Sequence, residues 1–232
     1  MATNYNPKTV TSSLVLALDA ANTKSYPGSG TTWTDLSSAG NNGTLTNGPT
    51  YSSANGGSIV FDGVNDYIDC GPVSQIGSSL TAFTASVWVK PAASAASCIL
   101  ENGDNFVTNT FYIFQENAQY FTFEIYDGAG YDAIYANYVY QTNTWYNLVG
   151  TWTSGNRINF YTNGVLAEGT RIGAVRTNVI SGNKNLFAGI RPGATLTYPF
   201  AGSMSNIQLY NRALSAAEIK QNFNAIRGRY NI

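Results

Sequence analysis

Short runs of alternating hydrophobic and polar residues recur along the chain, with the two-residue period of half-buried β-strands. The clearest run is FTASVWVK, at residues 83–90. Its side chains divide into two sets, Phe83, Ala85, Val87 and Val89 on one side and Thr84, Ser86, Trp88 and Lys90 on the other. The pattern therefore predicts a strand that separates two environments.

Turn sequences that contain glycine separate these runs at short intervals. They stand at residues 41–43, 47–49, 55–57, 62–63, 127–130, 154–156, 163–164 and 181–183. Residues 144–169 predict three strands joined by two hairpins, and Asn163-Gly164 favours a two-residue turn because both residues tolerate positive φ. Many short strands between such turns predict an all-β antiparallel sandwich or barrel.

One amphipathic helix is predicted near the end of the chain, in RALSAAEIKQNFNAI. Ser215 and Glu218 have the spacing of a capping box, and Leu214 and Ile219 have the spacing of a hydrophobic staple. Ile219 and Phe223 then share one face of the helix. Because about three turns are too short to be stable alone in water, we expect the helix to pack on the β-fold.

The chain has 232 residues, and no linker, repeat or low-complexity segment divides it. We therefore expect an N-terminal arm, residues 1–13, and one domain, residues 14–232. No apolar run approaches the ~18 residues of a membrane span, and the N-terminus lacks the pattern of an export signal. In such a chain Cys70 and Cys98 are expected to be reduced and buried rather than paired.

Charge is nearly balanced, with a formal net charge of −1, which argues against nucleic acid as a partner. Its distribution is uneven: residues 1–132 carry 11 acids and 3 bases, and residues 133–232 carry 2 acids and 9 bases. Either strands from the two halves interleave in space, or the subunit is dipolar and packs against copies of itself or a partner. The bases around the predicted helix form a solvated face or a docking surface; they are Arg212, Lys220, Arg227 and Arg229.

The chain contains no histidine, which removes the most frequent general base and metal ligand of proteins. Three carboxylates are concentrated in FDGVNDYIDC, at Asp62, Asp66 and Asp69. Asp62 and Asp66 flank a predicted turn, where Asp can hydrogen-bond to its own backbone, and Asp69 falls on the next strand. A turn role and a contribution to a calcium site both fit this pattern.

Six segments, in order, resemble the concanavalin A-like lectin/glucanase superfamily, in its laminin-G-like branch. They are LVLALDAANTKSYPGSGTTWTDLSSAGNNGTLTNGPTY, IVFDGVNDYIDC, FTASVWVKP, NTWYNLVGTW, INFYTNGVL and FAGSMSNIQLYNRALSAAEI. The resemblance covers nearly the whole chain and implies a two-sheet antiparallel jelly-roll sandwich with one short C-terminal helix. YNPKTVTSSLVLALDAAN and NFNAIRGRYNI further resemble versions of this domain in tailed-phage virion proteins.

Glucanases of this superfamily use a Glu-x-Asp-x-(x)-Glu strand, which positions two carboxylates for retaining hydrolysis. The nearest sequences here are ENGD at 101–104 and EIYD at 124–127, and neither alternates so that all its acids share a face. The sialidase-type Ser-x-Asp-x-Gly-x-Thr-Trp box is also absent. We therefore expect no catalytic residues, and the alternative is a degenerate glycoside hydrolase.

Many relatives hold a calcium ion that ties the N-terminal strand to the C-terminal one. By resemblance, the candidate ligands are Asp19 and carbonyls near Asn42 and Gly43. The acidic pair in the family pattern GxIDEVRIYNRAL is replaced here by Ser205 and Asn206. Bound calcium and a metal-free fold therefore both remain open, and no other cofactor is expected.

Aromatic residues are concentrated between residues 120 and 146. Tyrosine offers a flat apolar face and a hydroxyl, which suits contact with sugar rings and protein surfaces, although aromatic residues also fill strands. Alternation puts several tyrosines of YDGAGYDAIYANYVY on the same side. The predicted ligand-binding residues are Tyr126, Tyr131, Tyr135, Tyr138 and Tyr140.

These observations predict a non-catalytic protein of a bacteriophage virion surface, a capsid decoration or a tail component, that binds host cell-surface glycans. The alternative is a structural cement protein that binds other virion proteins or copies of itself without sugar. Neither nucleic acid nor a membrane is expected as a partner.

Overall fold

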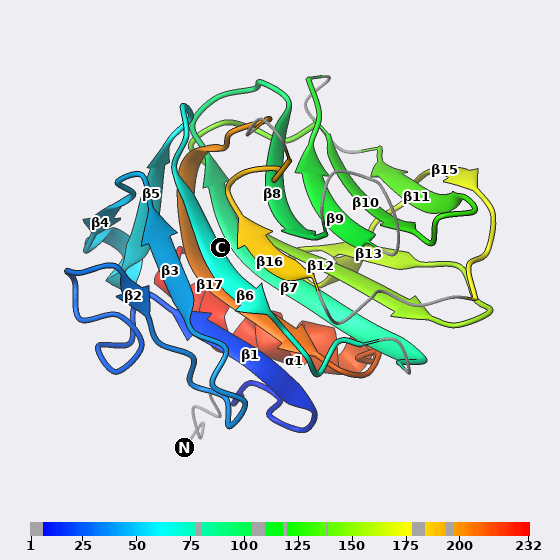
Figure 1. Ribbon diagram of the computed structural model, residues 1–232, viewed down its shortest axis with the longest axis horizontal. Helices are drawn as coiled ribbons and strands as arrows, with labels where there is room; N and C mark the ends of the chain where they lie inside the picture. The colour runs from blue at the N-terminus through cyan, green and yellow to red at the C-terminus, as the bar shows by residue number, and fades with distance from the viewer. Residues whose placement is uncertain are drawn as a thin grey trace, which may run out of the picture.

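Two antiparallel β-sheets pack face to face in the computed structural model, and α1 (Ala216–Ile226) lies against the far side of the rear sheet (Figure 1). The structure describes residues 7–77, 80–103, 110–117, 120–137, 139–177, 184–193 and 197–232. Within these ranges it contains no helix with the length and hydrophobicity of a membrane-spanning segment.

The front sheet in Figure 1 has nine strands among the described residues. In spatial order they are β15 (Gly169–Gly173), β11 (Tyr131–Ala136), β10 (Phe121–Tyr126), β9 (Thr110–Gln115), β8 (Ser97–Asn102), β16 (Asn185–Ala188), β6 (Tyr67–Pro72), β3 (Gly43–Thr46) and β2 (Thr32–Trp33).

The rear sheet has eight strands in the described part of the chain. Seven follow one another as β14 (Val165–Leu166), β13 (Asn159–Thr162), β12 (Tyr146–Thr153), β7 (Ala82–Pro91), β17 (Ala201–Tyr210), β5 (Ser58–Asp62) and β4 (Thr50–Ser52). The eighth, β1 (Leu14–Asp19), pairs with the second half of β17. The predicted two-sheet antiparallel sandwich with one C-terminal helix is confirmed.

The inner faces of the two sheets enclose one continuous hydrophobic core. The alternation along residues 83–90 has the predicted consequence, because Phe83, Ala85, Val87 and Val89 lie in this core. The other set faces the opposite side of the rear sheet, where Trp88 packs under the C-terminal helix. Each large side chain buried in this way stabilises the fold by roughly 1.5–3 kcal/mol.

The C-terminal helix begins at the predicted capping box. The Ser215 hydroxyl accepts a hydrogen bond from the Glu218 amide, and the Glu218 carboxylate accepts one from the Ser215 amide. Leu214 and Ile219 share a hydrophobic cluster, as a staple requires. Phe223 stacks on Trp88 with ring centroids 5.6 Å apart, so the helix covers the rear sheet.

Local turn chemistry also follows the sequence. Asn163 and Gly164 join β13 to β14 with φ values of 53° and 73°. In the turn after β5, the Asp62 carboxylate accepts a hydrogen bond from the Val64 amide, and the Asp66 carboxylate accepts one from the Asp62 amide. Asp69 on β6 accepts from the Gly71 amide. These acids therefore serve the backbone, which is the turn role offered by the sequence.

The uneven charge of the two halves of the chain is averaged out by the fold. Among the residues that the structure describes, four ion pairs join an acid from residues 1–132 to an arginine from residues 133–232; they are Asp19–Arg229, Glu101–Arg191, Asp127–Arg176 and Asp132–Arg157. The structure therefore agrees with interleaved strands rather than a dipolar subunit. Cys70 and Cys98 are both unpaired and buried, as predicted.

Candidate functional site

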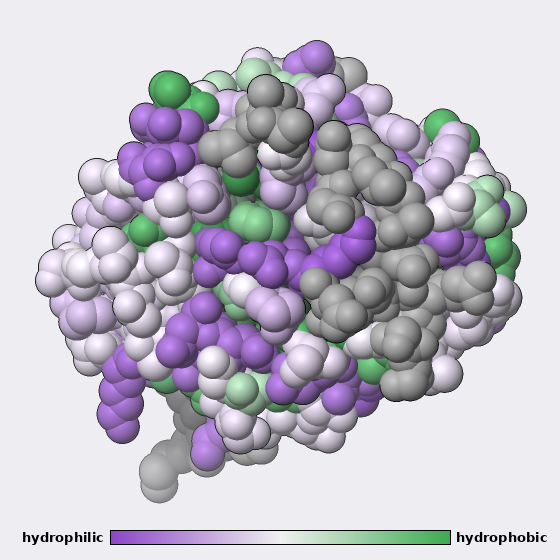
Figure 2. Space-filling view, viewed as in Figure 1, coloured by the Kyte–Doolittle hydropathy of each residue, from purple (hydrophilic) through white to green (hydrophobic). Residues whose placement is uncertain are grey.

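The outer face of the front sheet, meaning the side that points away from the core, lies opposite the face of the molecule that carries α1. Strand register places Glu101 on β8, Tyr112 on β9 and Glu124 on β10 side by side on this face. Thr122 on β10 and Tyr135 on β11 are register partners on the same face, two residues along β10 from Glu124. Hydrophilic side chains form a band across the middle of this face (Figure 2).

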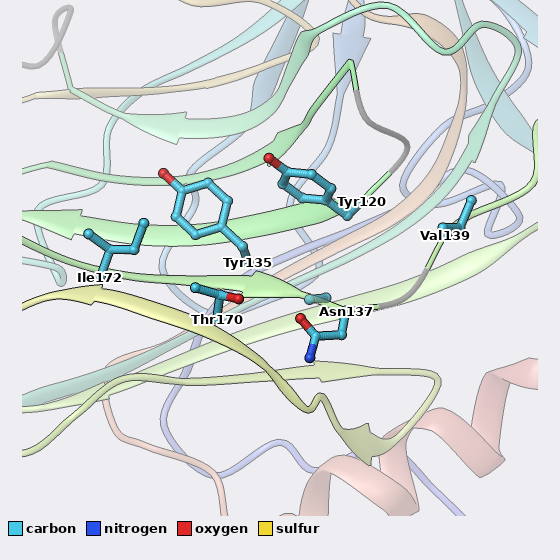
Figure 3. Close-up of a pocket in the computed structure, with 7 residues that line it drawn as sticks. Tyr120, Tyr135, Asn137, Val139, Thr170 and Ile172 are labelled. Carbon is cyan, nitrogen blue, oxygen red and sulfur yellow. The ribbon is translucent and has the colours of Figure 1, made fainter.

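One pocket, which we call the aromatic pocket, lies at the β10–β11–β15 side of this face and has a volume of about 610 Å³. It is lined by Tyr120, Tyr135, Ala136, Asn137, Val139, Thr170 and Ile172. The rings of Tyr120 and Tyr135 meet edge to face with centroids 5.7 Å apart. Figure 3 shows both hydroxyls pointing the same way, while Thr170 and Asn137 lie on the opposite side of the rings. The pocket combines flat apolar rings with a few hydrogen-bonding groups.

A second pocket, the arginine pocket, has a volume of about 310 Å³. It is lined by Ala96, Tyr112, Phe114, Glu116, Asn117, Arg191 and Tyr198. The Arg191 guanidinium lies 5.0–5.1 Å from the ring centroids of Tyr112, Phe114 and Tyr198. Its Nε donates to the buried Glu101 carboxylate at 3.0 Å. The ion pair thus fixes a guanidinium among three rings, a geometry that favours cation–π attraction.

Two carboxyl groups lie on this face, one in the lining of the arginine pocket and one beside Tyr112. Glu116 accepts a hydrogen bond from the Thr122 hydroxyl at 3.1 Å. Glu124 is hydrogen-bonded to Tyr112, and burial raises the pKa of its carboxyl to about 7. Burial also raises the pKa of Tyr135 to about 12, and the charges of Glu124 and Glu116 contribute to that increase. Both acids therefore act electrostatically on residues of both pockets.

The structure divides the predicted ligand-binding tyrosines into groups. Tyr126, Tyr131 and Tyr135 share the outer face of the front sheet, as alternation indicates. Of these, Tyr135 lines the aromatic pocket. The prediction is wrong for Tyr140, which is fully buried and stacks on Phe121 in the core, so its ring has no face to offer a ligand. Tyr138 lies outside the described residues.

Several residues of the site were not predicted. Tyr112 and Phe114 could have been found, because TFYIFQ at residues 110–115 alternates and places both on the face opposite Phe111. The sequence around Arg191 does not indicate its role in the site, because its partner Glu101 is 90 residues away in the sequence. Only the pairing of β8 with β16 brings the two segments together.

The two acidic segments considered as glucanase remnants do meet on one face, but through strand pairing and not within one strand. Glu101 and Glu124 flank Tyr112. Glu101 is fully buried and paired with Arg191, so its carboxylate is held away from a ligand. On this face the aromatic rings are placed to contact a ligand, whereas the two carboxyl groups are not placed as a reactive pair.

The residues expected to bind calcium by resemblance form other contacts. Both Asp19 oxygens accept hydrogen bonds from the Arg229 guanidinium, at 2.7 and 2.9 Å. The Asn42 side-chain oxygen accepts from the Asp35 amide, and Gly43 lies in β3 against Ile68. No group of three or more His, Cys, Asp or Glu side chains in the described ranges could hold a metal ion. The guanidinium therefore supplies positive charge at Asp19, and the side-chain oxygens of Asp19 and Asn42 already accept hydrogen bonds from protein groups.

Fold and site together define a lectin-like β-sandwich domain with an aromatic outer face. The family model of the concanavalin A-like lectin/glucanases superfamily matches residues 62–220, and the chain belongs to this family. No curated protein matches the chain in sequence.

Solved structures share the fold at low sequence identity. The receptor binding domain of botulinum neurotoxin D has a TM-score of 0.71 and 14% identity, over 92% of this chain and 52% of that one. Domain 4 of AbnA, a GH43 extracellular arabinanase from Geobacillus stearothermophilus, has a TM-score of 0.66 and 16% identity, over 90% and 97% of the two chains. The present chain thus spans about half the length of the neurotoxin domains.

Proposed function

We propose that this domain binds glycans through the outer face of its front sheet and does not cleave them. The observation that carries the proposal is the pair of aromatic-lined pockets on that face, with Tyr120 and Tyr135 in one and Tyr112, Phe114 and Tyr198 in the other. Aromatic rings pack on the apolar faces of sugars, and a few polar groups fix the orientation of the ligand.

Structural neighbours support this proposal. Domain 4 of AbnA was solved in complex with arabinotriose, and the botulinum neurotoxin serotype D ligand binding domain was solved in complex with N-acetylneuraminic acid. The neurotoxin structure has a TM-score of 0.71 and 13% identity to this chain. The fold thus carries sugar sites in proteins that differ widely in sequence.

The test is a binding measurement with a panel of immobilised glycans. Tyr120→Ala and Tyr135→Ala each remove one ring of the aromatic pocket, and we expect each to weaken binding about 3- to 10-fold, because one aromatic contact contributes ~0.5–1.5 kcal/mol. Tyr67→Ala is the matched control, since Tyr67 on β6 packs on Phe187 of β16 and lines neither pocket. An unchanged signal in both pocket variants would contradict the proposal.

Absence of cleavage is tested on the same sugars. We expect arabino-oligosaccharides and sialylated oligosaccharides to be recovered intact after long incubation, because the Glu101 carboxylate is buried and paired with Arg191. Release of shorter products, lost in Glu124→Gln, would instead favour a hydrolase that uses Glu124 as its acid.

We also propose that the protein is displayed on the virion of a bacteriophage, in many copies that raise a weak affinity for host glycans. The support is the resemblance of its first and last segments to phage virion domains. Mass spectrometry of purified virions is expected to detect the protein, and capsid or tail genes are expected beside its gene. Stable attachment to virions combined with a blank glycan panel would favour the structural cement role.

A further inference from the structure

We infer that the glycan site selects neutral sugars and rejects acidic ones such as sialic and uronic acids. The inference rests on the proposed glycan-binding function and adds the class of ligand. It follows from the positions of the carboxylates and of the arginines around the aromatic pocket and the arginine pocket.

Two carboxyl groups lie on the same outer face as the pockets. Glu116 lines the arginine pocket directly. Glu124 is the register partner of Tyr112 of the arginine pocket, and it lies on the same face as Thr122, the register partner of Tyr135 of the aromatic pocket. A ligand that extends from one pocket to the other therefore passes both carboxyl groups. Glu124, whose pKa is raised to about 7, is largely ionised only above that pH. A sugar carboxylate at the same place then meets charge of like sign in a partly desolvated site, which is unfavourable, so the binding comparison is made above pH 7.

The guanidinium of Arg191 does not offset this repulsion. Its side chain is only 4% exposed. Its Nε is bound to Glu101, and three aromatic rings surround it. The charge of this arginine is thus already compensated inside the protein, and the part of the pocket that a ligand reaches is formed by rings and by Glu116.

The arginine beside the aromatic pocket is also turned away from it. Arg171 lies on β15 between Thr170 and Ile172, which line the pocket. Its register partner is the core residue Ile134, and its guanidinium donates to the Ile158 carbonyl at 2.6 Å. Alternation therefore sends this cation to the inner side of the sheet, and the described lining of the aromatic pocket contains no basic side chain.

A neutral sugar can form hydrogen bonds with the same groups without electrostatic repulsion. Its hydroxyls can donate to carboxylates, which accept hydrogen bonds but cannot donate them when ionised. Asn117 and Asn137 add amide donors and acceptors at the two ends of the site. The apolar faces of neutral rings remain available for Tyr120, Tyr135 and Tyr198.

The experiment uses a panel of matched glycans, each present in a neutral form and in a sialylated or uronic acid form, probed with the full chain. At low salt we expect every acidic member to bind at least about 10-fold more weakly than its neutral counterpart. The ratio should shrink as salt rises, because added ions screen like-charge repulsion. The variant Glu116→Gln/Glu124→Gln should reduce the ratio several-fold.

Asp62→Asn is the matched control for loss of one negative charge. Asp62 lies in the turn after β5, and an asparagine oxygen can still accept from the Val64 amide. This variant should keep the wild-type ratio. Equal or stronger binding of acidic members, sensitive to Tyr135→Ala, would overturn the inference but leave glycan binding intact. A panel without any bound glycan would overturn both.

Discussion

The Arg191–Glu101 ion pair shows how much of this site depends on two single residues. Both side chains are almost completely removed from solvent, at 4% and 0% exposure. A buried charge that loses its partner pays its desolvation cost without compensation. Arg191 also separates three rings, so its removal leaves space on the outer face as well as an unpaired carboxylate.

We therefore predict that Arg191→Met lowers the free energy of unfolding by about 3–5 kcal/mol. The double variant Arg191→Met/Glu101→Gln should lose clearly less than the sum of the single variants, because no charge is then left buried. Urea unfolding of the four proteins gives this coupling, and Lys24→Met on the exposed surface is the control. Strict additivity would show that the pair is not coupled.

At the scale of the element, α1 is held by interactions that lie close together in sequence. Arg212 donates two hydrogen bonds to Glu218, at 2.9 and 2.6 Å, and Glu218 also caps the helix. The hydrogen bonds from the Arg212 side chain are the largest cause that lowers the pKa of Glu218 to about 2, and the hydrogen bond from the Ser215 amide is the second largest. The unfolded chain would titrate this group near 4.3.

The sign of the pH effect follows from these two values. The folded state favours ionised Glu218, so its contribution is complete above about pH 4.3 and disappears as pH falls toward about 2. We predict that Glu218→Gln costs only about 1 kcal/mol at pH 7, because solvent screens this partly exposed group, and almost nothing at pH 2. Urea unfolding at both values measures this, with Lys220→Gln as control. An equal cost at both values would contradict it.

The elements were predictable because their signals are local. Alternation over residues 83–90, the Asn163-Gly164 turn and the Ser215–Glu218 cap each act within a few residues of the chain. The ligand face was only partly predictable for the same reason. Alternation placed Tyr126, Tyr131 and Tyr135 together, but it could not show that Tyr140, which follows the strand, enters the core. Arg191 reaches Glu101 only through pairing between distant strands.

At the scale of the whole molecule, protein groups join the two ends of the sandwich. Asp19 closes β1, and Arg229 follows α1 at the end of the chain. The nearby Asn55 side chain donates to the Arg229 carbonyl at 3.1 Å, and the Trp145 ring packs against Tyr230 at a tilt of 38°. This tail therefore ties the start of the fold to its end.

We predict that EDTA leaves the thermal unfolding midpoint unchanged and that added calcium does not raise it. Arg229→Met should lower the midpoint by several degrees, because Asp19 then loses its only ion-pair partner among the described residues. Differential scanning calorimetry measures all three conditions, with Arg227→Met as the control in the same segment. A fall of several degrees in EDTA would show that calcium stabilises the protein after all.

The course of α1 also determines how the domain responds to tension. β1 begins beside Tyr210, where the helix segment starts, and ends near Arg229, where the tail arrives. The first strand and the last helix therefore run in the same direction along the rear sheet. A pull on the two ends of the chain draws them in opposite directions, which loads the contacts between them in shear, all at once rather than one after another.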